Sequence, residues 1–218
     1  MNERYRQRLE LIRAANAARL EQVSAPVSAS SAVASPAVTT TPVWTANSFL
    51  TLIDADLVRS GEPNRNGALF LDEDLLFGLP SVVNRPINFA HVTMEVCGVI
   101  TAAEIVPSPD GNGGVIRIQG ALWDWVQVDD VIETRAWLET DPGSAFVSME
   151  CIPNHVQCTG PNGCGEFFDY LDVLMGECCV HILNRTSIRR MVNPVFQGAA
   201  IILPPVKPGW SEAQLRSV

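Results

Sequence analysis

Long hydrophobic segments and positive charge are both scarce in this sequence. No apolar run approaches the roughly 18 residues that a membrane-spanning helix needs, and the charged N-terminus lacks the apolar segment of a secretory signal. The 15 Lys and Arg residues stand against 24 Asp and Glu, which gives a net charge of −9. This balance argues against nucleic-acid and anionic-membrane partners. Together these absences predict a soluble protein made in a cytosol.

Two hydrolase motifs are also absent. There is no G-x-S-x-G elbow, which argues against an α/β-hydrolase, and no H-E-x-x-H, which argues against a metalloprotease of that kind. Histidine is rare, since only His91, His155 and His181 occur. Because imidazole is the side chain best suited to accept a proton near neutral pH, a nucleophilic hydrolase built on this chain has few candidate bases.

What is present divides the chain into segments of different composition. The first segment is rich in Arg, Ala, Leu and Glu, and we expect a helix that docks on a partner or frays. The next contains only Ser, Ala, Val, Thr and Pro, which is typical of a flexible linker. The expected boundaries are 1–23 for the helix, 24–42 for the linker, 43–206 for a folded domain with a Cys-rich insertion at 153–181, and 207–218 for a C-terminal tail.

Strand signals dominate the folded domain. Apolar and β-branched residues predict strands, the second and third of them forming a hairpin, over residues 47–58, 94–106, 115–123, 145–152 and 199–203. Helices are expected near residues 73–78, with Asp72 as the N-cap, and over 129–140. Strands and helices mix without regular βαβ alternation, so the predicted fold class is α+β.

Ser148 and His91 are the candidate nucleophile and base. His91 precedes a predicted strand, and functional groups are commonly exposed at such loop-to-strand junctions. Ser148 lies in the segment F-V-S-M-E-C, where strand alternation places Ser148 and Glu150 on one face. Spacing alone leaves the pairing open, because most strand serines and single histidines are structural.

Several short motifs, taken in order, resemble those of phage head-maturation proteases. The chain has N-R-N-G at 64–67, R-P-I-N-F-A-H at 85–91 and V-C-G-V-I at 96–100, similar to that family's N-x-N-G turn, P-x-N-x-x-H segment and G-x-I strand. Further on, A-L-W at 121–123 and V-S-M-E at 147–150 resemble its second half, and F-Q-G-A-A-I-I before Pro204 and Pro205 resembles its closing strand. The likeness covers roughly residues 60–206.

The resemblance implies a fold similar to herpesvirus assemblin, a β-barrel-like antiparallel core flanked by helices. It implies a serine endopeptidase that cleaves scaffold and major capsid proteins inside the prohead, in the host cytoplasm, with the oligomeric state left open. The family's histidine falls on His91 and its serine on Ser148. A third group should orient His91: Glu150 is the first candidate because it shares a strand face with Ser148, and Glu95 is the second.

The Cys-rich segment predicts a metal site. Zn²⁺ favours four Cys or His ligands, often in two closely spaced pairs. Such a set is available in Cys158, Cys164, Cys178 or Cys179, and His181. Some similar phage proteases carry a C-x-x-C-G…C-x-H insertion, which favours structural zinc, not required for catalysis. Reduced buried thiols and disulfides remain the alternatives.

Two other functions fit the same residues. One is a non-catalytic virion or capsid structural protein on the same fold. The other is a small zinc-binding adaptor, in which the cysteine cluster is the functional part.

Overall fold

The computed structural model describes residues 50–123, 129–141 and 143–217. The chain divides into two units, residues 1–45 and 46–218, and all described residues belong to the second. The predicted helix at 1–23 and linker at 24–42 lie outside the described residues. No helix among the described residues is long and apolar enough to cross a membrane.

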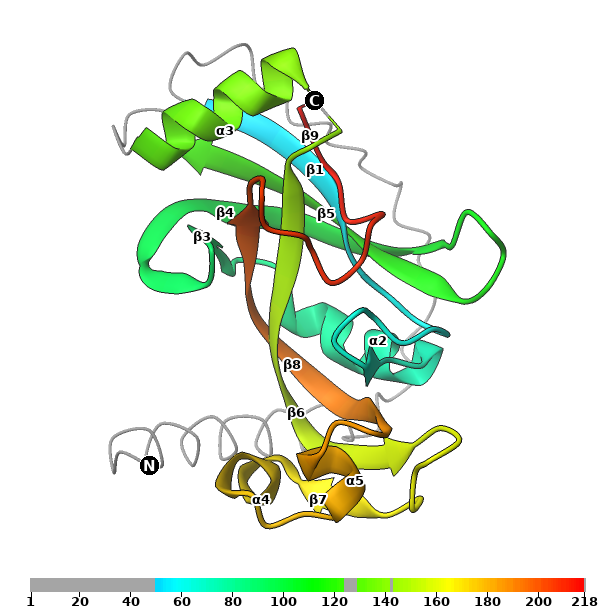
Figure 1. Cartoon of the computed structure of the whole chain (residues 1–218). Helices are drawn as coiled ribbons and strands as arrows, with labels where there is room; N and C mark the ends of the chain where they lie inside the picture. The colour runs from blue at the N-terminus through cyan, green and yellow to red at the C-terminus, as the bar shows by residue number, and fades with distance from the viewer. Residues whose placement is uncertain (1–49, 124–128, 142, 218) are drawn as a thin grey trace, which may run out of the picture. The chain divides into compact units, whose positions relative to one another are not determined.

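The described part is a mixed α+β structure dominated by one sheet, which confirms the predicted fold class. In chain order its elements are β1 (Leu50–Arg59), β2 (Ala68–Leu69), α2 (Asp72–Gly78), the 3₁₀ helix η1 (Leu79–Ser81), β3 (Pro86–Phe89), β4 (Val92–Pro107), β5 (Gly114–Trp123), α3 (Asp129–Thr140), β6 (Phe146–Thr159), β7 (Phe167–Asp169), α4 (Tyr170–Met175), α5 (Val180–Leu183), β8 (Ile188–Ile202) and β9 (Leu215–Ser217) (Figure 1).

The sheet has the strand order β7-β6-β8-β3-β4-β5-β1-β9, with β2 paired to β8 outside this path. The expected antiparallel core is found for most strand pairs, but β2 and β3 run parallel to β8. A parallel pair needs a long crossover connection, and β4, β5, α3 and β6 supply it between β3 and β8. The sheet is open by its pairing order, although an isolated antiparallel bridge between Phe146 and Gln214 links β6 to the segment before β9.

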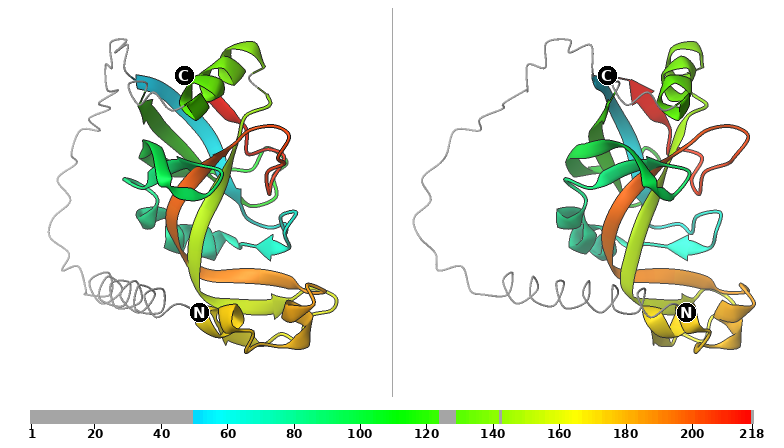
Figure 2. Two further views of the ribbon diagram at one scale, coloured as in Figure 1. Left: turned by 60° about the vertical axis from the view of Figure 1, so that its left-hand side comes forward. Right: turned by 90° about the vertical axis from the view of Figure 1, so that its left-hand side faces the viewer.

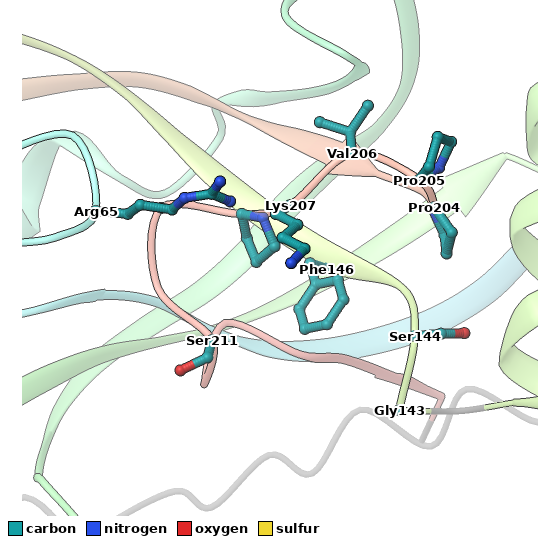
Figure 3. Close-up of a pocket in the computed structure, with 11 residues that line it drawn as sticks. Arg65, Gly143, Ser144, Phe146, Pro204, Pro205, Val206, Lys207 and Ser211 are labelled. Atoms are coloured by element: carbon teal, nitrogen blue, oxygen red, sulfur yellow. The ribbon is translucent and has the colours of Figure 1, made fainter.

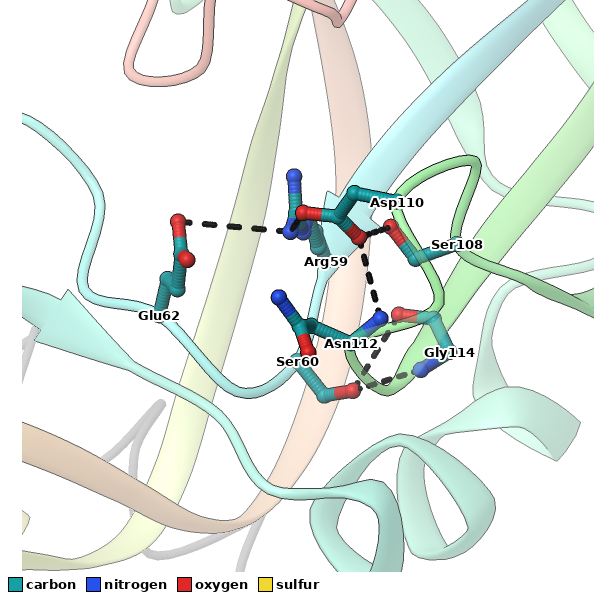
Figure 4. Close-up of polar contacts among 7 residues, drawn as sticks. All are labelled: Arg59, Ser60, Glu62, Ser108, Asp110, Asn112 and Gly114. Carbon is teal, nitrogen blue, oxygen red and sulfur yellow. Dashed lines mark hydrogen bonds and ion pairs between the residues drawn. The ribbon is translucent and has the colours of Figure 1, made fainter.

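The predicted hairpin at 94–106 and 115–123 is confirmed as the antiparallel pair β4 and β5. The turn between them is fixed by polar contacts (Figure 4). Asp110 pairs with Arg59 at the end of β1, and it accepts hydrogen bonds from Ser108 Oγ at 2.8 Å and the Asn112 N–H at 3.0 Å. The hydrogen bonds from Asn112 and Ser108, with the Arg59 charge, lower the pKa of Asp110 to about 2. These contacts attach the turn to β1.

Two strands are longer than the sequence predicted. β6 and β8 pair antiparallel from Phe146 and Ile202 at one end to Thr159 and Ile188 at the other. The prediction that 153–181 is an inserted loop is therefore wrong: its first residues continue β6, and the rest contains β7, α4 and α5. The 207–218 segment is not only a tail either, because β9 within it pairs with β1. Long-range pairing has extended strands whose ends carry weak local signals.

Residues 156–187, which we call the Cys-rich lobe, lie at one end of the β6–β8 pair (Figures 1 and 2). The remaining described residues form the body. Its core includes the fully buried side chains of Phe70, Leu75, Ile100, Ile118 and Phe196. Helix α2 covers part of this core. Its N-cap is Leu71 and not Asp72, and the Leu71 N–H donates to the carboxylate of Asp74 at 3.0 Å.

Candidate active site and metal centre

The candidate nucleophile lies where three strands meet. Ser148 on β6 pairs with Ala200 on β8, and Ala200 also pairs with Asn88 on β3. Directly paired residues project from the same face of a sheet. Ser148 and Asn88 therefore flank the small Ala200 side chain on a single face, although 60 positions separate them in the chain.

His91 reaches this face from the turn that follows β3. The Ala90 N–H donates to the Ile201 carbonyl at 3.0 Å, which fixes the turn to β8. Ala90 and His91 have φ angles of 47° and 65°, in the left-handed region. Residues other than glycine adopt this region at an energetic cost, and such strain is concentrated at functional sites. The predicted loop-to-strand position of His91 is confirmed.

The structure brings together Ser148, His91 and Glu150. The Ser148 Oγ lies 3.0 Å from His91 Nε2, and Glu150 Oε1 lies 3.0 Å from His91 Nδ1. Because an ionised carboxylate can only accept, Nδ1 carries the proton and Nε2 is left to accept from the serine hydroxyl. The arrangement has the geometry of the hydrogen-bond chain that activates the nucleophile in serine hydrolases. Among the described residues, Glu150 and not Glu95 makes the contact with His91.

Asn88 positions the carboxylate, a role that the sequence analysis missed. Its Nδ2 donates to both Glu150 oxygens at 3.2 Å. With the opposite amide orientation, the Asn88 Oδ1 acceptor would face the carboxylate oxygens of Glu150, which are also acceptors. The amide nitrogen of Asn88 must therefore face Glu150. The hydrogen bond from His91 lowers the pKa of Glu150 against the raising effect of burial, and the Asn88 bond acts in the same direction. Glu150 is therefore held ionised beside the imidazole.

Small residues on β8 allow these side chains to meet. Glu150 pairs with Gly198, and a Cβ placed on Gly198 would lie 2.9 Å from Glu150 Oε2 and 2.9 Å from the Pro86 carbonyl. Such a distance is too short for any real Cβ. The motif F-Q-G-A-A thus supplies space for the site, at Gly198 for Glu150 and at Ala200 for Ser148. This spacing was a signal that sequence reasoning could have used.

The three side chains are accessible from solvent to different degrees. The His91 side chain is 45% exposed and that of Glu150 is 18% exposed, while Ser148 is half-buried. The hydroxyl is therefore not sealed in the interior. The carboxylate of Glu150 is more shielded from water than the His91 ring.

The cysteine cluster forms a second polar centre, in the lobe. Ligand atoms of Cys158, Cys164, Cys179 and His181 all lie within 4.8 Å of one another. Cys158 lies one residue before the end of β6, and Cys164 lies in the segment that leads to β7, where its N–H donates to Cys158 Sγ at 3.4 Å. Cys179 is the N-cap residue of α5, and His181 lies within that helix. The choice left open between Cys178 and Cys179 is decided for Cys179.

The electrostatics of the cluster suit a cation. Burial raises the pKa of Cys158, but the neighbouring Ser187, the N–H of Cys164 and the thiol of Cys179 outweigh burial and lower the pKa. A hydrogen bond with the backbone of Glu166 lowers the pKa of Cys164. Partial desolvation and the neighbouring sulfurs of Cys158 and Cys179 outweigh this effect and raise the pKa to about 11. Several thiolates cannot form side by side without a compensating positive charge.

The donor set also fits a tetrahedral metal. His181 Nδ1 is buried without a hydrogen-bond partner among the described residues, which is the state expected of a free ligand atom. Three thiols and one imidazole form a zinc set, whose sulfurs lie about 3.8 Å apart when each binds at 2.3 Å. All six cysteines lie within the described residues, and none of them is in a disulfide there. Cys97 is fully buried in the core of the body.

Comparisons with protein-family models and with curated proteins found no match to this chain.

Proposed function

We propose that this protein is a serine endopeptidase of the phage head-maturation type, with Ser148 as nucleophile, His91 as base and Glu150 as the residue that orients the base. The observation that carries the proposal is the hydrogen-bond chain from Ser148 Oγ through the His91 ring to Glu150, with both distances at 3.0 Å. The order of the motifs that surround these residues supports the family and an assemblin-like fold.

The reaction follows from the roles of these atoms. Ser148 Oγ attacks the peptide carbonyl carbon while His91 Nε2 accepts the hydroxyl proton. The imidazolium then donates this proton to the leaving amine, the C–N bond breaks and an acyl ester remains on Ser148. Water, deprotonated by His91, hydrolyses the ester and restores the hydroxyl. Glu150 keeps the Nδ1–H tautomer and stabilises the imidazolium in both halves.

A covalent probe tests the activated serine without a known substrate. A fluorophosphonate should form a phosphonyl ester at Ser148 Oγ with loss of fluoride, and peptide mass spectrometry should locate it there. His91→Ala should lose labelling, whereas His155→Ala, which removes an exposed histidine further along β6, should keep it. Absence of labelling on Ser148 in the folded protein would overturn the proposal.

The proposed substrates are scaffold and major capsid proteins inside the prohead. Co-expression with those proteins should give fragments on a gel with the wild type and none with Ser148→Ala. Capsids that assemble with intact proteins in both cases would instead favour a non-catalytic structural role. The geometry favours the enzyme, because a purely structural serine has no need of an oriented imidazole.

We further propose that the cysteine cluster binds structural zinc through Cys158, Cys164, Cys179 and His181. Four protein ligands leave no open position for catalysis, so the metal would stabilise the lobe. Purified protein should contain about one zinc per chain by elemental analysis. Cys164→Ser should lose most of the metal and Cys178→Ser, at a half-buried cysteine outside the cluster, should retain it. Equal metal content in the two variants would contradict the assignment.

A further inference from the structure

A hollow of about 750 Å³ lies between the first residues of β6 and the loop that follows β8 (Figure 3). Its apolar wall includes Phe146 on β6 and the prolines and Val206 of the loop that follows β8. This volume lies within the range of protein sites that bind small ligands, so it is ample for a side chain of a peptide. The volume alone does not identify the occupant, but its position and charge do.

Its position follows from the regular alternation of β6. Phe146 is half-buried, Val147 is buried and Ser148 is half-buried, so Phe146 and Ser148 share the outer face. No bulge interrupts the pairing of β6 with β8 between these residues. Two strand residues span about 7 Å, which is also the span of two residues in an extended peptide. An extended substrate that runs along β6 past Ser148 thus places one of its side chains over the hollow. That side chain lies about two residues from the scissile bond.

The hollow also carries positive charge. Arg65 and Lys207, the only lysine in the chain, line it and are both exposed. Neither forms an ion pair with any residue that the structure describes, whereas the body's Arg117, Arg190 and Arg216 each pair with a carboxylate. Two cations beside an apolar wall, unpaired in a chain of net charge −9, are complementary to a carboxylate supplied from outside.

The walls are held in place before any ligand binds. The Arg65 N–H donates to the Gly209 carbonyl at 3.0 Å, which ties the turn after β1 to the loop after β8. Trp210 in the same loop packs on Phe70 in the core, with ring centroids 6.1 Å apart. A fixed hollow loses less conformational entropy on binding than a loop that must first be ordered.

We infer that the hollow is a substrate subsite that takes an apolar side chain near the scissile bond, with Arg65 and Lys207 binding a carboxylate beside it. The preferred substrate is therefore an extended peptide segment that is apolar and acidic. This inference rests on the proposed peptidase function, and it adds the class of sequence that the enzyme selects.

Binding can be measured apart from cleavage in the Ser148→Ala protein. The probes are two short, fluorescein-labelled peptides of Ala and Leu that differ only in carrying Glu or Lys. By fluorescence anisotropy, the Glu peptide should bind more tightly, and Lys207→Glu or Arg65→Glu should weaken it about tenfold. The double variant should reverse the preference, and Phe146→Ala should weaken both peptides. Arg135→Glu on α3, with the same change of net charge, should have little effect.

The single lysine gives a second readout. An acetylated, lysine-free Glu peptide should slow the modification of Lys207 by an amine-reactive reagent, followed by peptide mass spectrometry. Equal binding of the two peptides, or equal weakening by Arg135→Glu and Lys207→Glu, would overturn the inference. If the Glu peptide binds selectively but the wild-type enzyme cleaves no peptide and resists the fluorophosphonate, the subsite stands and the peptidase proposal fails.

Discussion

The body and the Cys-rich lobe are built on the same pair of long strands, but they are stabilised differently. The core of the body draws on nearly every strand and on α2, η1 and α3. The separate core of the lobe contains only Val156, Cys158 and Ile182 as buried residues. Exposed apolar side chains are frequent in the lobe, including Phe167, Val180 and Leu183. Burial of apolar surface can hold the body together, but it is scant in the lobe.

This difference explains the positions of the two polar centres. A module with so small a core usually needs a metal or disulfide cross-link, and the lobe has free cysteines gathered around one point. The candidate active site needs no such cross-link, because strand pairing fixes Ser148 and Glu150 and a backbone hydrogen bond from Ala90 fixes the turn that carries His91.

The largest expected effect is loss of the lobe on removal of metal. Zinc binding supplies on the order of 10 kcal/mol to small zinc modules, more than three partly apolar residues can provide. Chelation or Cys158→Ser should therefore abolish amide-exchange protection in β7, α4 and α5 while the amides of β4 and β5 stay protected. Unchanged protection of the lobe without metal would show that the two regions are stabilised alike.

The next effect is on catalysis, in the body alone. Glu150→Gln should lower kcat by roughly 10³- to 10⁴-fold, because the amide no longer fixes the His91 tautomer or stabilises the imidazolium. Thermal unfolding and zinc content should change little. Peptide cleavage rates and metal analysis on the same preparation provide the measurement. A variant that retains wild-type kcat would remove Glu150 from the catalytic site.

A buried ion pair tests the stability of the body. Asp74 is 1% exposed at its side chain and pairs with Arg190 Nε at 2.8 Å. Asp74→Ala leaves this arginine without its buried partner and should lower the free energy of unfolding by about 3 kcal/mol. Glu73→Ala is the matched control, since Glu73 contacts the same arginine but is 66% exposed, and it should lose less than about 1 kcal/mol. Urea unfolding followed by fluorescence distinguishes them.

Gly198→Ala should impair the active site through packing. The added Cβ would lie 2.9 Å from the Glu150 carboxylate and from a backbone carbonyl, so Glu150 must move. Displacement of a catalytic group by about 1 Å can reduce the rate about 10²-fold, and overpacking should lower stability by about 1–3 kcal/mol. Steady-state kinetics and thermal unfolding measure the two effects. Wild-type kinetics would show that Glu150 has room to shift without loss.

The smallest effect concerns pH. Hydrogen bonds from His91 and Asn88 lower the pKa of Glu150 in the folded protein. The stability that the ionised form contributes is therefore fully present above the ordinary glutamate pKa of about 4.3 and is lost as the pH falls through the lowered value. The difference in unfolding free energy between wild type and Glu150→Gln should stay constant near neutral pH and shrink in acid. A difference that grows in acid would reverse the assigned direction.

The sequence alone predicted several elements of the fold and most of the candidate site residues. Strand alternation placed Ser148 and Glu150 on one face of a strand, and the order of the motifs identified His91 as the candidate base. The ligand types at Cys158, Cys164 and His181 predicted a metal-binding group. The hairpin of β4 and β5 and the span of α3 followed from residue propensities. These features depend on neighbours close in the chain, which a sequence displays directly.

The strand pairing and the contacts between distant residues were visible only in the tertiary structure. The pairing of β3 and β6 on either side of β8 brings Asn88 to Glu150, and the motif that contains Asn88 does not say which residue it contacts. The same pairing extends β6 and β8 into the lobe, and the fold of α5 selects Cys179 over Cys178. The physical reason is that backbone register between distant strands sets which side chains share a face, and the sequence does not state which strands will pair.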